Sequence, residues 1–341
     1  MQTMDSRWIF VIVAVAGLGA SAAILRFLLA SGLAWRLATD VPNDRSLHSK
    51  PVPRVGGWAI VPVVCVSIWL VAPQLWLAAL LALALAVVSQ VDDRRGLPAR
   101  IRFAAHIAAV AVFIAATPGD VPAWALVALA VLLVWLVNLY NFMDGSDGLA
   151  GGMALFGFGG YALAAGFGPH PDAGLAMAAT AVMAAAAGFL VFNFHPARVF
   201  LGDAGSIPLG FLAGALGYWG WINSVWPIWF PPLVFLPFIA DASVTLLRRI
   251  LRRERVWLPH KEHYYQRMVR SGMGHAATAR AWYVAMGAGV TIAMLALQLK
   301  PLMQWIAAGA WAVVLLLAGL NIDRRWQQYR GRVDSAEVTR K

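Results

Sequence analysis

Five aspartates stand in short polar segments that follow or interrupt long apolar runs. Asp92 and Asp93 are adjacent, Asp144 and Asp147 lie three residues apart in a glycine-containing segment, and Asp203 lies in a second one. Carboxylate oxygens suit a hard cation such as Mg²⁺, and glycines let the backbone approach a phosphate closely. These residue types and spacings indicate Mg²⁺-dependent phosphoryl transfer.

Amide and basic side chains accompany these carboxylates. Asn138 and Asn141 precede the second pair of aspartates, and Asn193 precedes the last aspartate. A helix that begins near Ser206 would place its positive N-terminus beside an anion. The side chains available to hold phosphates are Lys50, Arg54, His260, Lys261 and His263.

The composition excludes most soluble proteins. Of 341 residues, 61% are hydrophobic and only 13% are charged, against roughly 25% charged in an ordinary soluble domain. A soluble chain could not bury that much apolar surface, so a soluble enzyme, a disordered protein and a nucleic-acid-binding domain are excluded. The single cysteine, Cys65, excludes a disulfide within the chain and a cysteine metal site.

Eleven apolar segments are predicted to cross a membrane as helices. They are 8–35, 56–72, 74–91, 103–117, 123–142, 149–167, 174–194, 206–223, 228–247, 278–298 and 302–321. Pro227, Pro231, Pro232 and Pro237 predict a broken or kinked helix within 206–247. The whole chain, 1–341, is therefore predicted to be one all-α integral membrane domain, a bundle of about 10–11 transmembrane helices.

The basic residues predict the orientation. Between these spans, 24 of the 27 Lys and Arg residues fall on one side, and the exceptions are Arg7, Arg26 and Lys300. That side is predicted to be cytoplasmic, with the N-terminus outside and the C-terminus inside. The polar cytoplasmic segments are then 36–54, 92–102, 142–150, 195–205, 248–277 and 322–341. The net charge of +11 is explained by topology and anionic lipid headgroups, so no nucleic-acid partner is predicted.

Five motifs in a fixed order resemble the polyprenyl-phosphate N-acetylhexosamine-1-phosphate transferase family, which includes MraY-like and WecA-like enzymes. The motifs occupy 40–57, 92–93, 138–149, 193–206 and 259–263. The resemblance implies transfer of a sugar 1-phosphate from a UDP-sugar to undecaprenyl phosphate, with release of UMP. It implies Mg²⁺, with Mn²⁺ as an alternative, and an active site on the cytoplasmic face of a bacterial inner membrane. A homodimer is left open.

The resemblance also implies roles for individual residues. Asp203 and Asn141 match the family's Mg²⁺ ligands, and the alternative for both is helix capping. Asp92 and Asp93 match a pair proposed to deprotonate or orient the lipid phosphate. Because a phosphate monoester has a second pKa of about 6, we favour orientation, with Asp92 in direct contact. A covalent aspartyl-phosphate is the less favoured mechanism, and the alternative without function is a solvated helix end.

Further matches concern substrate binding. Phe200 matches an aromatic residue that stacks on uracil, Asp147 is the better candidate for nucleotide or sugar contact, and Asp144 is equally suited to stabilising its loop. His263, with a catalytic role, and His260 are expected near the pyrophosphate or the sugar. The predicted substrate-binding residues are Lys50, Arg54, Asn138, Asp144, Asp147, Asn193, Phe200 and His260.

The remaining polar residues have simpler interpretations. Asp241, within an apolar run, is expected to pair with a neighbour inside the bundle. The arginines between 248 and 255 are interpreted mainly as interfacial anchors, with lipid-phosphate binding as the alternative. His106 and His275 receive no role.

The fifth motif departs from the family, because it has the form His-x-x-His-x-Tyr-Gln, from His260 to Gln266. This form is most similar to initiators of O-antigen-type surface polysaccharides, so an N-acetylhexosamine or a 6-deoxy-N-acetylhexosamine is the expected sugar. Peptidoglycan or teichoic-acid synthesis is the alternative within the family. Among other classes, a transporter would place its ionisable groups near the membrane midplane, and a CDP-alcohol phosphotransferase needs a pattern that is absent here.

Overall fold

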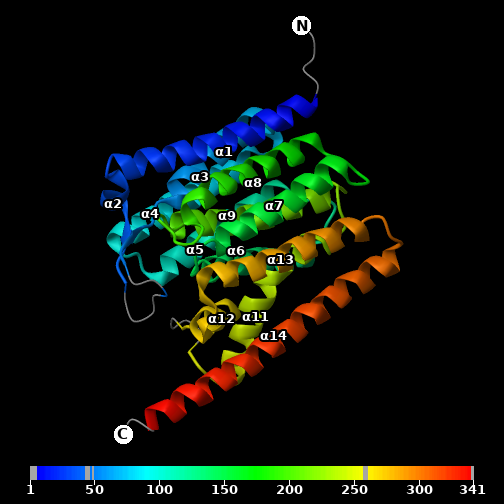
Figure 1. The fold of residues 1–341 in the computed structure, drawn as a ribbon. Coiled ribbons are helices and arrows are strands. Elements are labelled where there is room, and N and C mark those ends of the chain that lie inside the picture. The colour runs from blue at the N-terminus through cyan, green and yellow to red at the C-terminus, as the bar shows by residue number, and fades with distance from the viewer. Residues whose placement is uncertain (1–5, 43–46, 48–49, 256–259, 339–341) are drawn as a thin grey trace.

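The computed structural model describes residues 6–42, 47, 50–255 and 260–338 of the chain. Long helices pack side by side, and the last one crosses the bundle obliquely (Figure 1). The helices of the first half are α1 (Ser6–Ala30), α2 (Leu33–Leu37), α3 (Gly56–Val71), α4 (Trp76–Arg95), α5 (Ala99–Ala116), α6 (Ala123–Phe142) and α7 (Leu149–Phe167). Those of the second half are α8 (Ala173–Asn193), α9 (Asp203–Ile222), α10 (Phe230–Val234), α11 (Leu236–Leu251), α12 (Tyr264–Met268), α13 (Gly274–Ala296) and α14 (Pro301–Val338).

Short elements complete the fold. The 3₁₀ turn η1 (Pro73–Leu75) precedes α4, and the π-helical turn η2 (Val269–Met273) joins α12 to α13. Strands β1 (Thr39–Asp40) and β2 (Val52–Pro53) form a small antiparallel pair in which Thr39 opposes Pro53. This pair holds the segment before α3 against the end of the bundle.

The chain is an all-α integral membrane protein. Within the described residues, eight helices are long and apolar enough to cross a membrane, three fewer than predicted. Each of the eleven apolar segments forms helix, but α3 is a shorter apolar helix and α11 has only 16 residues and carries Asp241 and arginines. Nearly every residue of α9 from Ala204 to Gly220 is buried, so this helix faces protein rather than lipid and needs less hydropathy.

The predicted interruption between 206 and 247 is confirmed. Helices α10 and α11 are separated at Phe235, whose backbone leaves the helical region (φ −93°, ψ 7°). Proline lies in the first turn of both helices, where its missing N–H costs no hydrogen bond. The break lets α11 leave the direction of α10 and carry Asp241 towards α12.

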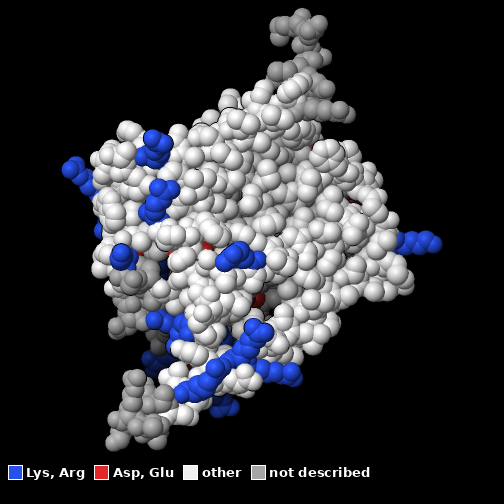
Figure 2. Space-filling model, viewed as in Figure 1, with Lys and Arg blue, Asp and Glu red and all other residues white. Residues whose placement is uncertain are grey.

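The basic residues gather at one end of the bundle. Figure 2 shows Lys and Arg concentrated at the end where α2 and α12 lie, with few at the opposite end. The two chain termini lie at opposite ends of the molecule (Figure 1). The charge therefore separates in space as the sequence predicts, and the compartment that each end faces stays a prediction.

Candidate active site

A cavity of about 430 Å³ opens at the end of the bundle that carries the basic residues. Segments far apart in the chain contribute to it, because it collects residues from the first, third and fourth motifs. Its lining comprises Asp40, Leu47, Arg54, Asn141, Asp144, Gly145, Ser146, Asp147, Asn193, Phe200, Gly202, Asp203 and His275. Five predicted substrate-binding residues and both predicted metal ligands therefore share one hollow.

Arg54 is the positive centre of this cavity. Its guanidinium lies 2.8 Å from Asp93, 3.7 Å from Asp40 and 4.0 Å from Asp203. Burial alone would lower the pKa of Arg54, but Asp93, Asp203 and Asp40 together raise it above its ordinary value. The side chain therefore stays charged and holds three carboxylates around it.

The backbone next to Arg54 joins the first motif to the fourth. Phe200 donates its N–H to the Pro53 carbonyl (2.8 Å), and its own carbonyl accepts from the N–H of Gly56 (2.9 Å). A Cβ at Gly57 would overlap the backbone of Ala204, so glycine is required where α3 meets α9. This contact places Phe200 and Arg54 on the same wall of the cavity.

Asp203 and Asn141 meet where α9 begins and α6 ends. The Ser206 hydroxyl donates to Oδ1 of Asn141 (2.9 Å), and Asn141 also hydrogen-bonds Asp203. The capping alternative for Asp203 is wrong, because the N-cap residue of α9 is Gly202, and no side chain caps the helix. The Asp203 side chain remains 22% exposed, so it is accessible from the cavity.

The two aspartates of the third motif have different surroundings. Oδ2 of Asp147 accepts from the Ala197 N–H (3.1 Å) and lies 2.6 Å from Nδ1 of His195. Asp147 therefore braces the turn after α8, a structural task like the one given as an alternative for Asp144. Burial first, and the nearby Asp203 second, raise the pKa of Asp144 to about 7. Both carboxylates line the cavity, and their contact with substrate stays a prediction.

Asn193 also holds the walls of the cavity in place. It donates to the Val199 carbonyl and accepts from the Gly148 N–H, both at 2.9 Å. Gly148 has a φ of +74°, which glycine adopts without strain. The third and fourth motifs are therefore tied together by one buried amide.

Other predicted residues do not line the cavity. Asp92 accepts from the Leu97 N–H (2.6 Å) and pairs with Arg102 (3.0 Å), so it stabilises the turn after α4. Asn138 donates to Val134 in its own helix and contacts His106, and Lys50 is exposed. A role for these three at the substrate stays a prediction. Asn43, Arg45 and His48 of the first motif and Pro259 of the fifth lie outside the described residues.

His263 belongs to a separate buried cluster. Its Nδ1 lies 3.1 Å from Oδ1 of Asp241, which confirms that Asp241 pairs inside the bundle. Asp241 also accepts from the N–H groups of Tyr264 (2.9 Å) and Tyr265 (3.1 Å) and so holds the start of α12. The Tyr265 hydroxyl donates to the Phe142 carbonyl (3.2 Å), beside the cavity. His263 is thus a positioning residue in this geometry, and a catalytic role stays a prediction.

His260 lies against the same cluster, with its ring 4.8 Å from that of His263. Burial first, and the nearby His263 second, lower the pKa of His260 to about 4, so its ring is neutral at pH 7. Two neighbouring arginines also have structural partners: Arg248 pairs with Asp323 (2.7 Å) and Arg249 with Glu254 (2.8 Å).

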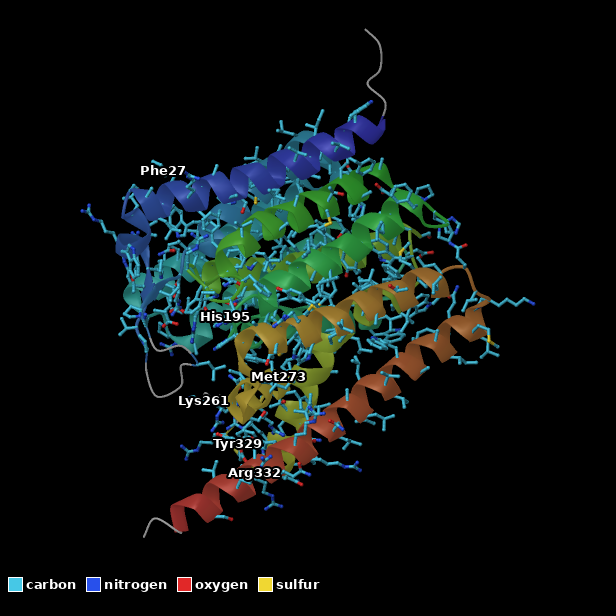
Figure 3. The ribbon with its side chains drawn as sticks, viewed as in Figure 1. Phe27, His195, Lys261, Met273, Tyr329 and Arg332 are labelled. Atoms are coloured by element: carbon cyan, nitrogen blue, oxygen red, sulfur yellow. The ribbon has the colours of Figure 1, made fainter. Side chains whose placement is uncertain are left out.

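The cavity includes residues that the sequence reasoning does not assign. Nδ1 of His275 lies 2.9 Å from the Ser146 hydroxyl, and its ring stacks on His195 with centroids 5.5 Å apart. Figure 3 shows His195 at the end of α8 beside α13. His275 and Ser146 are 129 positions apart, so no spacing rule could have found the contact. Asp40 is the first residue of the first motif, and its place in that motif was the available signal.

The donor set of this cavity fits a hard divalent cation. Asp40, Asp93, Asp144 and Asp203 surround one guanidinium, which leaves an excess of negative charge in a partly buried space. Oδ2 of Asp93 is buried without a hydrogen-bond partner. Within the described residues, no group of three His, Cys, Asp or Glu side chains could hold a metal alone. Magnesium is commonly held by one or two carboxylates together with substrate phosphates, which agrees with this arrangement.

This chain is similar to one family model and to several named sugar-phosphate transferases. The model of glycosyl transferase family 4 matches residues 75–220. The chain is 29% identical over 329 residues, 89% of each chain, to a probable undecaprenyl-phosphate N-acetylglucosaminyl 1-phosphate transferase of Bacillus subtilis. It is 30% identical over 328 residues, 79% of each chain, to a decaprenyl-phosphate N-acetylglucosaminephosphotransferase of Mycobacterium tuberculosis. An undecaprenyl-phosphate alpha-N-acetylglucosaminyl 1-phosphate transferase of Yersinia pestis is 25% identical over 323 residues, 85% of this chain and 86% of the relative.

Proposed function

Because this chain belongs to glycosyl transferase family 4 and is an enzyme that transfers sugar phosphate to polyprenyl phosphate, we propose that its cavity joins a UDP-linked N-acetylhexosamine to undecaprenyl phosphate. The observation that carries this proposal is the meeting of Asp203, Asn141, Asp144 and Arg54 in one hollow. The basic end of the bundle is proposed to face the cytoplasm of a bacterial cell, across the inner membrane.

The proposed reaction is a single displacement. An oxygen of the lipid phosphate attacks the sugar-linked phosphorus of the UDP-sugar, and the bond between the two phosphates of the nucleotide breaks. The products are undecaprenyl-pyrophosphoryl-sugar and UMP. No protein nucleophile is needed, because a phosphate monoester is mostly dianionic at neutral pH.

Asp203 and Asn141 would hold Mg²⁺, with Asp144 close by, and Mn²⁺ is the alternative cation. When bound, such a cation polarises the phosphoryl oxygens and offsets the charge that develops on the leaving group. Arg54 would hold an anionic phosphate, and its 2.8 Å contact with Asp93 would fix the direction of its guanidinium. Phe200 offers an aromatic face to the base of the nucleotide.

The names of the relatives support N-acetylglucosamine as the sugar. The His-x-x-His departure suggested a 6-deoxy-N-acetylhexosamine, but His260 and His263 do not line the described cavity. The departure of these two histidines from the family pattern therefore gives no direct support for a 6-deoxy-N-acetylhexosamine. The relatives also favour cell-wall or related glycan synthesis as the pathway class, and O-antigen initiation remains a proposal.

A substrate panel tests the function. Membranes that contain the protein are incubated with undecaprenyl phosphate and separate UDP-sugars, and lipid products are identified by mass spectrometry. We expect an undecaprenyl-pyrophosphoryl-N-acetylhexosamine and UMP in equal amounts. Absence of a lipid product from every UDP-sugar, N-acetylglucosamine and 6-deoxy-N-acetylhexosamine donors included, would contradict the proposed donor class.

Magnesium binding is expected to depend on pH. Because the pKa of Asp144 is raised to about 7 in the cation-free cavity, a proton competes with Mg²⁺ below that pH. A single group with this pKa predicts about tenfold weaker Mg²⁺ binding at pH 6 than at pH 8. The measurement is calorimetric titration of the purified protein without substrates, since the lipid phosphate itself titrates near pH 6. Equal affinities at both pH values would contradict the prediction.

A further inference from the structure

Two adjoining hollows lie where α14 leaves the bundle, away from the cavity of Asp203. One is an apolar groove of about 330 Å³ between α11, α13 and α14, and the other is a polar pocket of about 230 Å³ between η2 and α14. Met268 and Ile322 line both. An apolar groove that continues into a polar pocket has the two-part chemistry of a lipid.

The polar pocket is built for an anion. Its polar lining consists of Ser271, Asn321, Arg325, Gln328, Tyr329 and Arg332, all hydrogen-bond donors. No carboxylate is among the described lining residues. Figure 3 shows Met273, Tyr329 and Arg332, three residues of this lining, at the same end of the molecule. A phosphate group would therefore meet positive charge and donors on several sides.

The arginines of this pocket are available to a ligand. Two nearby carboxylates whose side chains the structure describes already have partners: Asp323 pairs with Arg248 and Arg267, and Glu254 pairs with Arg249. Within the part of the chain that the structure describes, Arg325 and Arg332 form no ion pair. Both are exposed on a helix whose other arginines add to the same positive field.

The pocket begins at the depth of lipid headgroups and continues along α14 towards Arg332. The apolar run of α14 ends at Leu320, and twenty helical residues from Pro301 span about 30 Å, the thickness of the hydrocarbon layer. Asn321 is the first polar residue beyond it. Trp326 follows one turn later, where aromatic residues are favoured at the membrane surface.

The groove beside it suits an acyl chain. Its lining is mostly alanine, leucine and valine from three helices, with Trp282 and Tyr264. The one described carboxylate in its lining, Asp241, is already held by His263 and by backbone N–H groups. No unpaired polar group would therefore oppose a hydrocarbon chain.

We propose that these two hollows form one binding site for an anionic phospholipid of the leaflet at the basic end of the bundle. The phosphate lies between Arg325 and Arg332, and an acyl chain lies along α14. The pocket shares no lining residue with the cavity of Asp203, so a phosphate between Arg325 and Arg332 lies in a different hollow from that carboxylate. The occupant is accordingly a resident lipid rather than the substrate, and the site does not depend on the proposed reaction.

The test measures lipid binding to the purified full-length protein in a neutral detergent. The titrant is dioctanoyl phosphatidylglycerol, with dioctanoyl phosphatidylcholine and inorganic phosphate as separate arms. The double variant Arg325→Gln with Arg332→Gln is expected to bind phosphatidylglycerol at least about tenfold more weakly. The matched control, Arg324→Gln with Arg330→Gln, removes the same charge from residues outside the pocket and is expected to change affinity less than about twofold.

A second pair of variants tests the groove. Ala318→Trp fills the groove beside the pocket and is expected to weaken phosphatidylglycerol binding about tenfold, whereas Leu317→Trp, outside the lining, is expected to leave it unchanged. Equal losses in the two arginine variants would overturn the proposal in favour of diffuse surface attraction. Binding of inorganic phosphate as tight as that of phosphatidylglycerol, or tighter binding of farnesyl phosphate at the same arginines, would also overturn it.

Discussion

Replacing Asp203 by asparagine is expected to lower sugar-phosphate transfer by about 10³-fold, while the protein still inserts into membranes. Asparagine keeps the size of the side chain and its ability to hydrogen-bond Asn141. The substitution removes the negative charge that would bind a divalent cation. The same charge forms an ion pair with Arg54 at 4.0 Å. Loss of one group aimed at the reacting charge typically has an effect of this size.

The measurement is the initial rate of lipid product formation in membranes that contain equal amounts of each protein. Asp120→Asn is the matched control. It makes the same chemical change at a residue that is exposed in the loop between α5 and α6. A thermal melting curve shows whether either variant is less stable. Near-normal transfer by Asp203→Asn would remove the assignment of this residue to the metal.

Removal of divalent cations is expected to stop transfer completely, and added Mg²⁺ is expected to restore it. The physical reason is the charge around the cavity: four carboxylates face one guanidinium, and both substrates bring further phosphates. Without a cation these anions repel one another and cannot be held together. The proposed ligands Asp203 and Asn141 supply oxygen atoms only, so Mg²⁺ should restore activity and Mn²⁺ should substitute for it.

The experiment treats purified protein with EDTA, removes the chelator and measures transfer with and without Mg²⁺. EDTA saturated beforehand with Mg²⁺ is the control for effects of the chelator itself. Transfer at the full rate in cation-free protein would contradict the metal proposal. It would not change the family assignment or the geometry of the site.

Local features of the sequence were sufficient for much of the fold. Every predicted apolar segment forms helix. Unpaired backbone N–H and C=O groups are costly in hydrocarbon, and a helix pairs them within the segment itself. The break at Phe235 followed from prolines, whose effect acts within one turn. Eight of the eleven predicted segments are helices long and apolar enough to cross a membrane, and α9 is among the other three. Other helices bury α9, so it needs less hydropathy than a helix that faces lipid.

The candidate site was predictable as a set of residues but not as an arrangement. Asp203, Asn141, Arg54 and Phe200 were identified from motifs, and they share one cavity. The separate roles of the two aspartates in the third motif were not predictable. Asp147 braces the turn after α8 by accepting a hydrogen bond from its backbone. His263 stood in a motif, yet it lies with Asp241 in a separate cluster.

The sequence by itself determined that this is a helical membrane protein with carboxylates at the ends of apolar runs. These properties depend on composition and on neighbours within a few helical turns, and both can be read directly from the sequence. The tertiary structure alone decided that His275 reaches Ser146, that Arg54 bridges Asp93 and Asp203, and that α14 closes two further hollows. Such contacts depend on how distant helices pack, and packing is set by the whole set of side chains at once.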